Sequence, residues 1–333
     1  MFLLKVFKNA SFKRCSQIVR WVQHQSGRPR ILIYADMVWC ALRHGAGYYD
    51  YANFGFWTLN ERQRATYVTR FRNKRLLDRF NDRAHYEDFN DKHRFIERFS
   101  PFMHRQTLDL TLVSAEQFRA FIYTHPIFFA KRSRSCGGKG VRRVRAADYP
   151  DGTALLTALL TDGLTILEAP VEQHPTLSAL HPQSVNTLRI VTDFVRGEAR
   201  IAYIVLKVGR GEAYCDNSGC GGLFCRVDPA SGVVLSDAID DDRAVYTQHP
   251  DTLHRFCGLH IPFFGEALQL ALRCAAVIPE IGHIGWDIAI TPTGAELVEG
   301  NADAGVMCQF APHTPEKRGL WPYYKALFRA RTE

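Results

Sequence analysis

The chain has 333 residues, of which 46% are hydrophobic, and its formal net charge is +8. This composition excludes a disordered chain and allows one large core or two to three smaller lobes. The positive charge favours a phosphate-bearing or otherwise anionic partner. The nine cysteines are scattered without CxxC spacing, which argues against a zinc site and favours reduced thiols in a reducing, cytoplasmic compartment.

The N-terminal segment is basic and amphipathic. Residues 1–35 contain no acid, and seven Lys or Arg lie among apolar side chains. The apolar run is too short for a transmembrane helix and lacks a small-residue cleavage site, so neither a spanning anchor nor a secretory signal is expected. Two interpretations stay open. The segment packs as a helix with a basic outer face, or residues 1–27 lie on an anionic membrane surface.

Two helices are predicted next along the chain. Apolar residues at helical spacing indicate one long helix over Leu59–Phe80 and a shorter one over Asp91–Phe99. Arginine is frequent here, but exposed aromatics and a known nucleic-acid motif are missing. We therefore interpret these charges as solvated helix surface and expect no nucleic-acid partner.

Short strands and helices follow from residue 108 onward. Ser114 and Gln117 predict a capping box for a helix that ends near Tyr123. An apolar strand over Pro126–Lys131 then leads into a basic, glycine-rich loop, which returns to the strand-like sequence VRRVR.

The glycine-rich loop is a candidate phosphate cover. Glycines let the backbone approach a ligand with its N–H groups exposed, and lysines add positive charge. The residues concerned are Lys131, Gly137, Gly138, Lys139 and Gly140. The spacing is not that of a Walker loop, and an ordinary β-hairpin turn is the alternative.

The strand Leu164–Val171 runs into a proline-containing bend that could clasp an adenine base. Adenine needs a backbone C=O for its amino group and a backbone N–H for its ring nitrogen. The carbonyl of Glu168 or Ala169 and the N–H of Val171 could supply them, because Pro170 has no N–H to donate.

A third apolar strand, Asn186–Val195, carries Arg189 on one face. An arginine held on a strand is suited to a bidentate grip on phosphate or carboxylate, and an exposed surface arginine is the alternative. A strand over Ala199–Val208 and a helix over Phe263–Val277 complete this part of the chain.

The segment Ile284–Gly305 predicts a hairpin with a tight turn at Pro292–Gly294. The turn sets the register of the two strands. The expected partners are Thr291 with Ala295, Ile288 with Val298, and Asp287 with Glu299. Alternation then points Trp286, Ile288, Ile290 and Val298 to the buried side.

The same register places acids opposite each other, with Asn301 on the same side as Glu299. Like charges in that position are destabilising unless a cation lies between them. The all-oxygen set of Asp287, Glu299 and Asn301 suits Mg²⁺ or Mn²⁺ shared with substrate phosphates. The alternative is that one acid is merely solvated.

Together these pieces resemble the ATP-grasp superfamily. The motifs NDKHRF, EQHPTLSALHPQSVNTLRIVT, DNSGCGGLF, GWDIAIT and VEGNADAG resemble its sugar-transfer associated branch over residues 51–310. The resemblance implies an α+β fold in which two lobes clasp a nucleotide. We expect a mainly helical N-terminal region at 1–90, lobe 1 at 91–165 and lobe 2 at 166–333.

The resemblance also implies roles for individual residues. Lys92 and Lys131 would contact the phosphates of ATP, and residues 137–140 would form a mobile lid. Residues 168–171 would hold adenine, and Arg189 would stabilise the transferred phosphoryl group. Mg²⁺ would lie on the acids of the late hairpin. Asn217, Gly221 and Gly222 would border the acceptor site.

The leading hypothesis is an ATP-dependent carboxylate–amine ligase that acts through an acyl-phosphate on small-molecule substrates. No side-chain nucleophile is needed, in agreement with the missing GxSxG motif. The family name points to cell-surface carbohydrate or secondary-metabolite biosynthesis. The alternatives are a phosphotransferase acting on a small molecule or sugar, and a non-catalytic nucleotide-binding module.

Overall fold

The structure, a computed structural model, describes residues 11–135 and 140–330, and these divide into two compact units. The described residues up to Phe80 and those from Gly305 onward form one unit, and Asn81–Ala304 form the other. The regions expected from the sequence divide the chain differently. Residues from Gly305 onward belong to the same unit as the N-terminal helices, and residues 91–304 of the two expected lobes lie together in the other unit.

The first unit is mainly helical, as expected. Ser11 caps helix α2 by accepting a hydrogen bond from the N–H of Arg14. The described α-helices of this unit are α2 Phe12–Ser26, α3 Arg30–His44, α4 Tyr48–Asn53, α5 Glu61–Arg64, α6 Arg70–Phe80 and α13 Trp321–Ala330. In residues 11–135 and 140–330, every helix falls short of the length and apolar content needed to cross a membrane.

The prediction of one helix over Leu59–Phe80 is wrong, because the chain leaves the helical path between α5 and α6. Arg64 turns inward and donates to both carboxylate oxygens of Asp36, each at 2.7 Å. The N–H of Val68 donates to Oε1 of Gln309 at 2.9 Å instead of to a helical carbonyl. Tertiary contacts therefore override the helical spacing in this segment.

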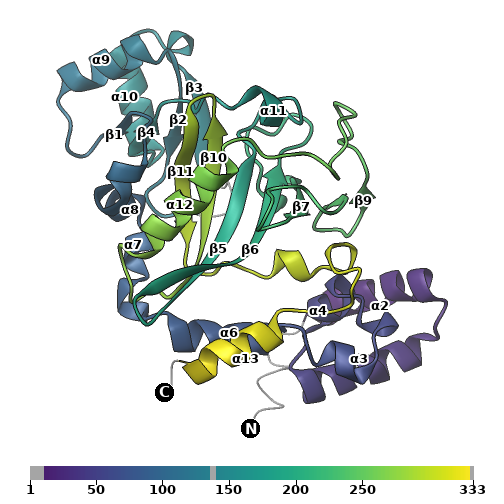
Figure 1. Ribbon diagram of the computed structural model, residues 1–333. Helices are drawn as coiled ribbons and strands as arrows, with labels where there is room; N and C mark the ends of the chain where they lie inside the picture. The colour runs from purple at the N-terminus through teal and green to yellow at the C-terminus, as the bar shows by residue number, and fades with distance from the viewer. Residues whose placement is uncertain (1–10, 136–139, 331–333) are drawn as a thin grey trace. The chain divides into compact units, whose positions relative to one another are not determined.

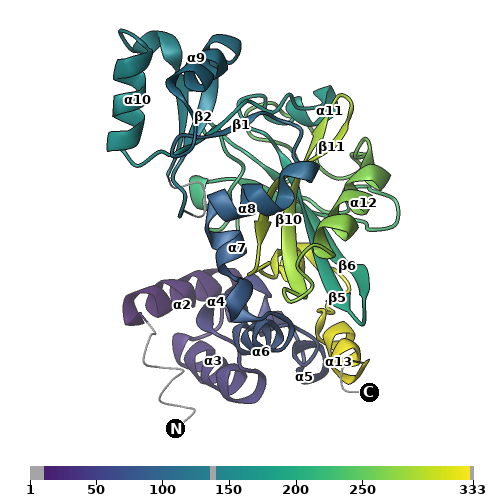
Figure 2. The same ribbon diagram turned by 90° about the vertical axis from the view of Figure 1, so that its left-hand side faces the viewer.

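The second unit contains two antiparallel sheets. The smaller has four strands in the order β1-β4-β2-β3. Their bounds are Thr107–Asp109, Ile166–Glu168, Ile127–Lys131 and Val141–Arg145. Helices α9 Ala115–Thr124 and α10 Gly152–Thr161 pack on this sheet around a shared apolar core (Figure 2). The predicted capping box of Ser114 and Gln117 is confirmed at the start of α9.

Short helices α7 Glu87–Asn90 and α8 Lys92–Phe99 precede the small sheet in the chain. Asp91 caps α8 by accepting from the N–H of His93 at 3.0 Å. Phe95 and Phe99 point into the core, as the helical spacing predicted. The cap therefore fixes the first residue of α8, which is Lys92.

The larger sheet has seven strands in the order β11-β10-β5-β6-β7-β8-β9. Alternation buries residues such as Ile190 and Ile288 against α12, which runs along the sheet (Figure 1). Arg189 and Asp287 consequently lie on the opposite face. The bounds are β5 Thr187–Val195, β6 Glu198–Val208, β7 Leu223–Val227, β8 Ala238–Ile239, β9 Val245–Tyr246, β10 His283–Thr291, β11 Gly294–Asn301, α11 Pro175–Ser178 and α12 Phe264–Ala275.

The hairpin of β10 and β11 has a two-residue turn at Pro292–Thr293, one residue shorter than predicted. Thr291 therefore pairs with Gly294 and not with Ala295. Gly294 has a φ of 143°, a backbone conformation that favours glycine, and this closes the shorter turn.

A bulge between Asp287 and Ile288 then restores the predicted pairing of the acids. Ile288 pairs with Leu297 instead of Val298, and Asp287 pairs with Glu299. Val298 is the extra residue of the bulged strand. The predicted burial of Val298 is therefore wrong: Leu297 is fully buried in the core, whereas Val298 lines a pocket on the other face.

Candidate active site

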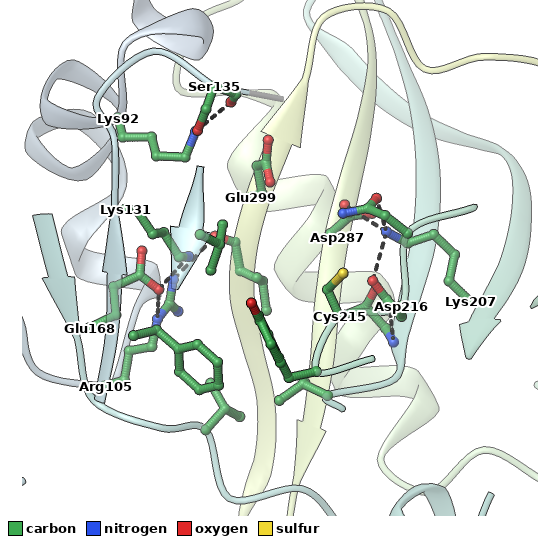
Figure 3. A pocket seen from close by; sticks show the side chains of 18 of the residues that line it. Lys92, Arg105, Lys131, Ser135, Glu168, Lys207, Cys215, Asp216, Asp287 and Glu299 are labelled. Carbon is green, nitrogen blue, oxygen red and sulfur yellow. Dashed lines mark hydrogen bonds and ion pairs between the residues drawn. The ribbon is translucent and has the colours of Figure 1, made fainter. Parts of the chain in front are cut away.

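Both sheets of the second unit contribute side chains to one pocket (Figure 3). Eight of the residues predicted from the sequence line it. They are Lys92, Lys131, Glu168, Ala169, Val171, Asn217, Asp287 and Glu299.

A row of charged residues crosses three strands of the larger sheet. Glu299 on β11 lies opposite Asp287 on β10, which lies opposite Arg189 on β5. Arg189 donates from Nε to Oδ1 of Asp287 at 2.6 Å and from Nη2 to Oδ2 at 3.0 Å. Arg189 is therefore a buried, paired side chain and not the exposed arginine of the alternative interpretation.

Gly285 makes this pairing possible. A Cβ on this glycine would lie 2.7 Å from Cδ of Arg189, so any side chain here would displace the arginine. The aliphatic part of Arg189 thus lies against the backbone of Gly285. This glycine, two residues before Asp287, was not singled out in the sequence.

Lys207 on β6 joins the same group, and sequence reasoning missed it. Its Nζ lies 3.1 Å from Oδ2 of Asp287, 3.3 Å from Oδ1 of Asp216 and 3.4 Å from Oδ1 of Asn217. The side chain is buried (Figure 3). A signal was present, because a lone lysine in the apolar strand sequence IVLKV needs buried partners.

The charges of this group stabilise one another. Burial alone would raise the pKa of Asp287, but Arg189 and Lys207 lower the pKa of its carboxyl to about 2. Burial would lower the pKa of Lys207, yet Asp216 and Asp287 keep it above its ordinary value. The carboxylate and both cations therefore stay ionised across the physiological pH range.

A second buried carboxylate, Glu168, organises the other side of the pocket. Its Oε2 accepts from Nζ of Lys131 at 2.7 Å and from Nε of Arg105 at 2.8 Å. Arg105 also donates to Oε1 of Glu296 at 2.9 Å and to the carbonyl of Leu297 at 2.7 Å. Despite burial, Arg105 and Lys131 lower the pKa of Glu168 to about 2.

Arg105 was not predicted, and its sequence gave no signal. It lies in the irregular segment MHRQ, and its partners are 63 and 191 residues away in the chain. The side chain is nevertheless buried. It links β4 of the small sheet to β11 of the large sheet, beside the pocket.

Lys92 lies at the edge of the glycine-rich loop. Its Nζ donates to the carbonyl of Ser135 at 2.7 Å, and its backbone N–H donates to the carbonyl of Ser133 at 3.0 Å. Gly140 has a φ of 84° and accepts from the N–H of Arg132 at 3.0 Å. Three predicted loop residues, Gly137, Gly138 and Lys139, lie outside the described residues. Gly140 does not line the pocket.

The predicted adenine hinge borders the pocket through Ala169 and Val171. The N–H of Ala169 donates to the carbonyl of Gln106 at 2.9 Å, so it is not available to a ligand. Use of the Val171 N–H for a base stays a prediction.

The predicted acceptor residues divide into two kinds. Asn217 lines the pocket, whereas Gly221 and Gly222 do not. A Cβ on Gly222 would lie 2.2 Å from the carbonyl oxygen of Asp216, so this glycine allows the loop to fold tightly. The glycines therefore shape the loop that presents Asp216 and Asn217.

The hairpin of β10 and β11 offers oxygen ligands to a divalent cation, although Asp287 already forms ion pairs with Arg189 and Lys207. In residues 11–135 and 140–330, no three His, Cys, Asp or Glu side chains cluster as a metal site. The predicted set has two carboxylates and an amide, and the amide nitrogen of Asn301 is 3.5 Å from Oδ2 of Asp287. Oδ1 of Asp287 accepts one bond, which leaves it a lone pair. Glu299 is directed into the pocket, and carboxylate oxygens suit Mg²⁺ or Mn²⁺, whereas Asn301 does not line the pocket. Metal binding by this set therefore stays a prediction.

The family model described as "Sugar-transfer associated ATP-grasp" matches residues 153–321 of the chain. The fold is therefore that of the ATP-grasp class. The chain belongs to the sugar-transfer associated ATP-grasp family, and the family resemblance seen in the sequence is confirmed.

Three solved structures illustrate what the chain is similar to. An N5-carboxyaminoimidazole synthetase from Staphylococcus aureus, complexed with ADP, is 10% identical over 68% of this chain and 50% of that one, with a TM-score of 0.39. The ATP-grasp ligase PsnB, complexed with minimal precursor, is 12% identical over 75% and 64%, with a TM-score of 0.44. D-alanyl-alanine synthetase A from Vibrio cholerae is 12% identical over 74% and 66%, also at 0.44.

The chain thus spans between half and two thirds of the length of these structures. No curated protein matches it significantly.

Proposed function

We propose that the chain is an ATP-dependent carboxylate–amine ligase that forms an amide bond through an acyl-phosphate and releases ADP and phosphate. The observation that carries this proposal is the single pocket in which Lys92, Lys131 and Lys207 lie with the paired acids Asp287 and Glu299. Membership of an ATP-grasp family supports ATP as the phosphoryl donor.

The pocket suits a nucleotide because cationic and apolar walls meet in it. Phe129, Ala169 and Val171 provide apolar surface for a base, next to the predicted hinge. Lys92 and Lys131 would neutralise the phosphates. When bound, Mg²⁺ or Mn²⁺ would offset triphosphate charge from ligands on Asp287, Glu299 and Asn301.

The proposed reaction has two steps. A carboxylate oxygen of the substrate attacks the γ-phosphorus of ATP, and the bond from that phosphorus to ADP breaks. An amine then attacks the acyl carbon, phosphate leaves, and the proton of the amine passes to solvent or phosphate.

In both steps the chain neutralises charge and orients its substrates. Arg189 and Lys131 are the proposed catalytic residues. Arg189 donates twice to Asp287 and once, from Nη1 at 3.4 Å, to the carbonyl of Ala304, which leaves two N–H groups for phosphoryl oxygens. The side chain lies behind Asp287 and does not itself line the pocket. Asn217 is proposed to contact the acceptor, on a loop shaped by Gly221 and Gly222.

The proposed setting is biosynthesis of cell-surface carbohydrate or a secondary metabolite in the cytoplasm. The family description, which names sugar transfer, supports a role in carbohydrate biosynthesis. Cys40, Cys225 and Cys274 are buried free thiols, which supports a reducing compartment.

Hydroxylamine trapping tests the mechanism. The chain is incubated with ATP, Mg²⁺ and a panel of uronic acids, amino acids and small peptides, and products are identified by mass. A hydroxamate together with ADP is the expected result, whereas AMP would reject the acyl-phosphate. A phosphorylated acceptor that is stable to hydroxylamine would identify a phosphotransferase. ATP binding without turnover, equal in the wild type and in Asp287→Asn, would identify a non-catalytic module.

A further inference from the structure

Helix α3 is apolar on two opposite faces, and within residues 11–135 and 140–330 only one of them is covered by protein. Ile33, Met37 and Cys40 are buried within the helical unit. The other face is exposed and is called here the exposed α3 face. It consists of Ile31 (73% exposed), Leu32 (58%), Val38 (43%), Trp39 (51%) and Leu42 (49%).

The spacing of these residues makes one continuous stripe. Residues 31 and 38, and residues 32 and 39, are seven positions apart. Residue 42 is four positions after 38 and three after 39, so all five lie along the same side of the helix. The stripe is about 17 Å long at the rise of an α-helix. A contiguous apolar stripe of this kind marks an interaction surface, unlike a single exposed leucine.

The charges around the stripe identify the kind of partner. Arg28 and Arg30 lie at the beginning of α3, and Arg43 lies at its end; all three are exposed. Three further exposed cations lie on α2, at Lys13, Arg14 and Arg20. The acid of residues 11–44, Asp36, is neutralised by Arg64. One acid touches the stripe: Oε1 of Glu61 accepts from Nε1 of Trp39 at 3.0 Å and lies 3.6 Å from Nη1 of Arg64, which offsets its charge.

An apolar helix face bounded by arginines and containing a tryptophan fits the interface of an anionic bilayer. Apolar side chains enter the acyl boundary, the indole lies at headgroup level, and arginines meet anionic lipids. A second copy of this chain fits less well, because it brings the same positive charge.

We propose that the exposed α3 face lies on an anionic membrane surface, with α3 in the plane of the membrane. The sequence suggested such contact for residues 1–27, and the exposed α3 face moves it to Arg30–His44. This inference does not depend on the ligase assignment.

Vesicle sedimentation tests the proposal with the full chain. The probes are vesicles of phosphatidylcholine alone and vesicles with about one third phosphatidylglycerol. We expect the wild type to bind the anionic vesicles and to dissociate as salt rises. The variant Val38→Ser/Leu42→Ser should bind at least about tenfold more weakly. Circular dichroism establishes that each variant is folded.

The matched control is Leu112→Ser/Leu253→Ser, which removes two apolar side chains that are 83% and 63% exposed in the other unit. It should bind like the wild type. A second variant, Arg28→Gln/Arg43→Gln, keeps the stripe and should lose the preference for anionic vesicles.

Four results would overturn the proposal. The wild type fails to bind anionic vesicles, or Val38→Ser/Leu42→Ser binds as well as the wild type. Light scattering shows that the wild type is a dimer that does not bind vesicles, and that Val38→Ser/Leu42→Ser is a monomer. A second copy of the chain would then cover the exposed α3 face. Binding occurs only after residues 2–10 are deleted, which makes that segment the occupant.

Discussion

Two buried carboxylates, Asp287 and Glu168, each hold two cations beside the same pocket, but they are connected to the fold in different ways. The partners of Asp287 are Arg189 and Lys207, which lie on strands of the same sheet. Glu168 contacts Lys131 in its own sheet, and through Arg105 it is joined to the other sheet. Asp287 therefore fixes charge within one rigid surface, whereas Glu168 takes part in a link between two surfaces.

This difference teaches that similar ion clusters can serve different ends. The Asp287 cluster presents charge to the pocket, and its loss should reduce the catalytic rate more than the free energy of unfolding. The Glu168 cluster includes Arg105, and its loss should lower the free energy of unfolding more than the catalytic rate. The predictions below test this division, from the largest expected effect to the smallest.

Asp287→Asn should reduce ADP release at least about a thousandfold, because it removes the proposed metal ligand and leaves Lys207 and Arg189 without their shared anion. Steady-state ADP assays with an identified substrate measure it. The matched control is Glu296→Gln, which alters a buried acid outside the pocket lining. Comparable activity in Asp287→Asn and wild type would contradict the assignment of this cluster to catalysis.

Arg105→Met should lower the free energy of unfolding by about 3–5 kcal/mol, because Glu296 and part of Glu168 lose their buried counter-ion. Urea unfolding followed by circular dichroism measures the change. Arg98→Met on the exposed side of α8 is the control and should change stability by less than about 0.5 kcal/mol. If both variants unfold alike, Arg105 does not link the sheets energetically.

Acid should destabilise the second unit through both carboxylates. Their ordinary pKa values of 3.8 and 4.5 are lowered to about 2 in the folded chain. A lowered folded-state pKa contributes stability that is complete above the ordinary value and is lost as pH falls toward 2. Each contribution is roughly 2–3 kcal/mol.

Unfolding free energies measured between about pH 5 and pH 3 check this prediction. Asp287→Asn and Glu168→Gln should each flatten the dependence on pH. A slope unchanged in both variants would show that other groups control acid unfolding.

Gly285→Ala should reduce kcat/KM by about tenfold, because its Cβ would push Arg189 away from Asp287. Gly265→Ala on α12 is a matched control, since a Cβ there meets nothing within 4 Å. Equal kcat/KM values in the two variants would mean that a shift of Arg189 does not affect the reaction.

The sequence predicted those parts of the site that depend on local pattern. Alternation and the turn placed Asp287 opposite Glu299, although the turn was taken as one residue too long. The predicted acid pair is correct because the bulge at Val298 compensates for the error of one residue in the turn. The strand that carries Lys131 and the capping box that begins α9 were also predictable, because each depends on neighbours in the chain.

The parts that could not be predicted depend on distant partners. Arg105 lies in an irregular segment, and only the folded chain brings it to Glu168 and Glu296. The break between α5 and α6 arises because Arg64 and Val68 find partners elsewhere in their unit. Neither outcome is encoded in the spacing of apolar residues.

The bulge at Val298 reverses the alternation of β11, so that different positions face the core before and after it. On the turn side, even-numbered positions of β10 and odd-numbered positions of β11 point to the core, whereas beyond the bulge Glu299 points to the pocket. Two consecutive residues, one aliphatic and one acidic, thereby face the ligand space. Removing Val298 would remove the bulge: Glu299 would then follow Leu297 directly and would still face the pocket opposite Asp287. The acid pair therefore tolerates loss of the extra residue, and Val298 instead adds an aliphatic side chain beside the acid.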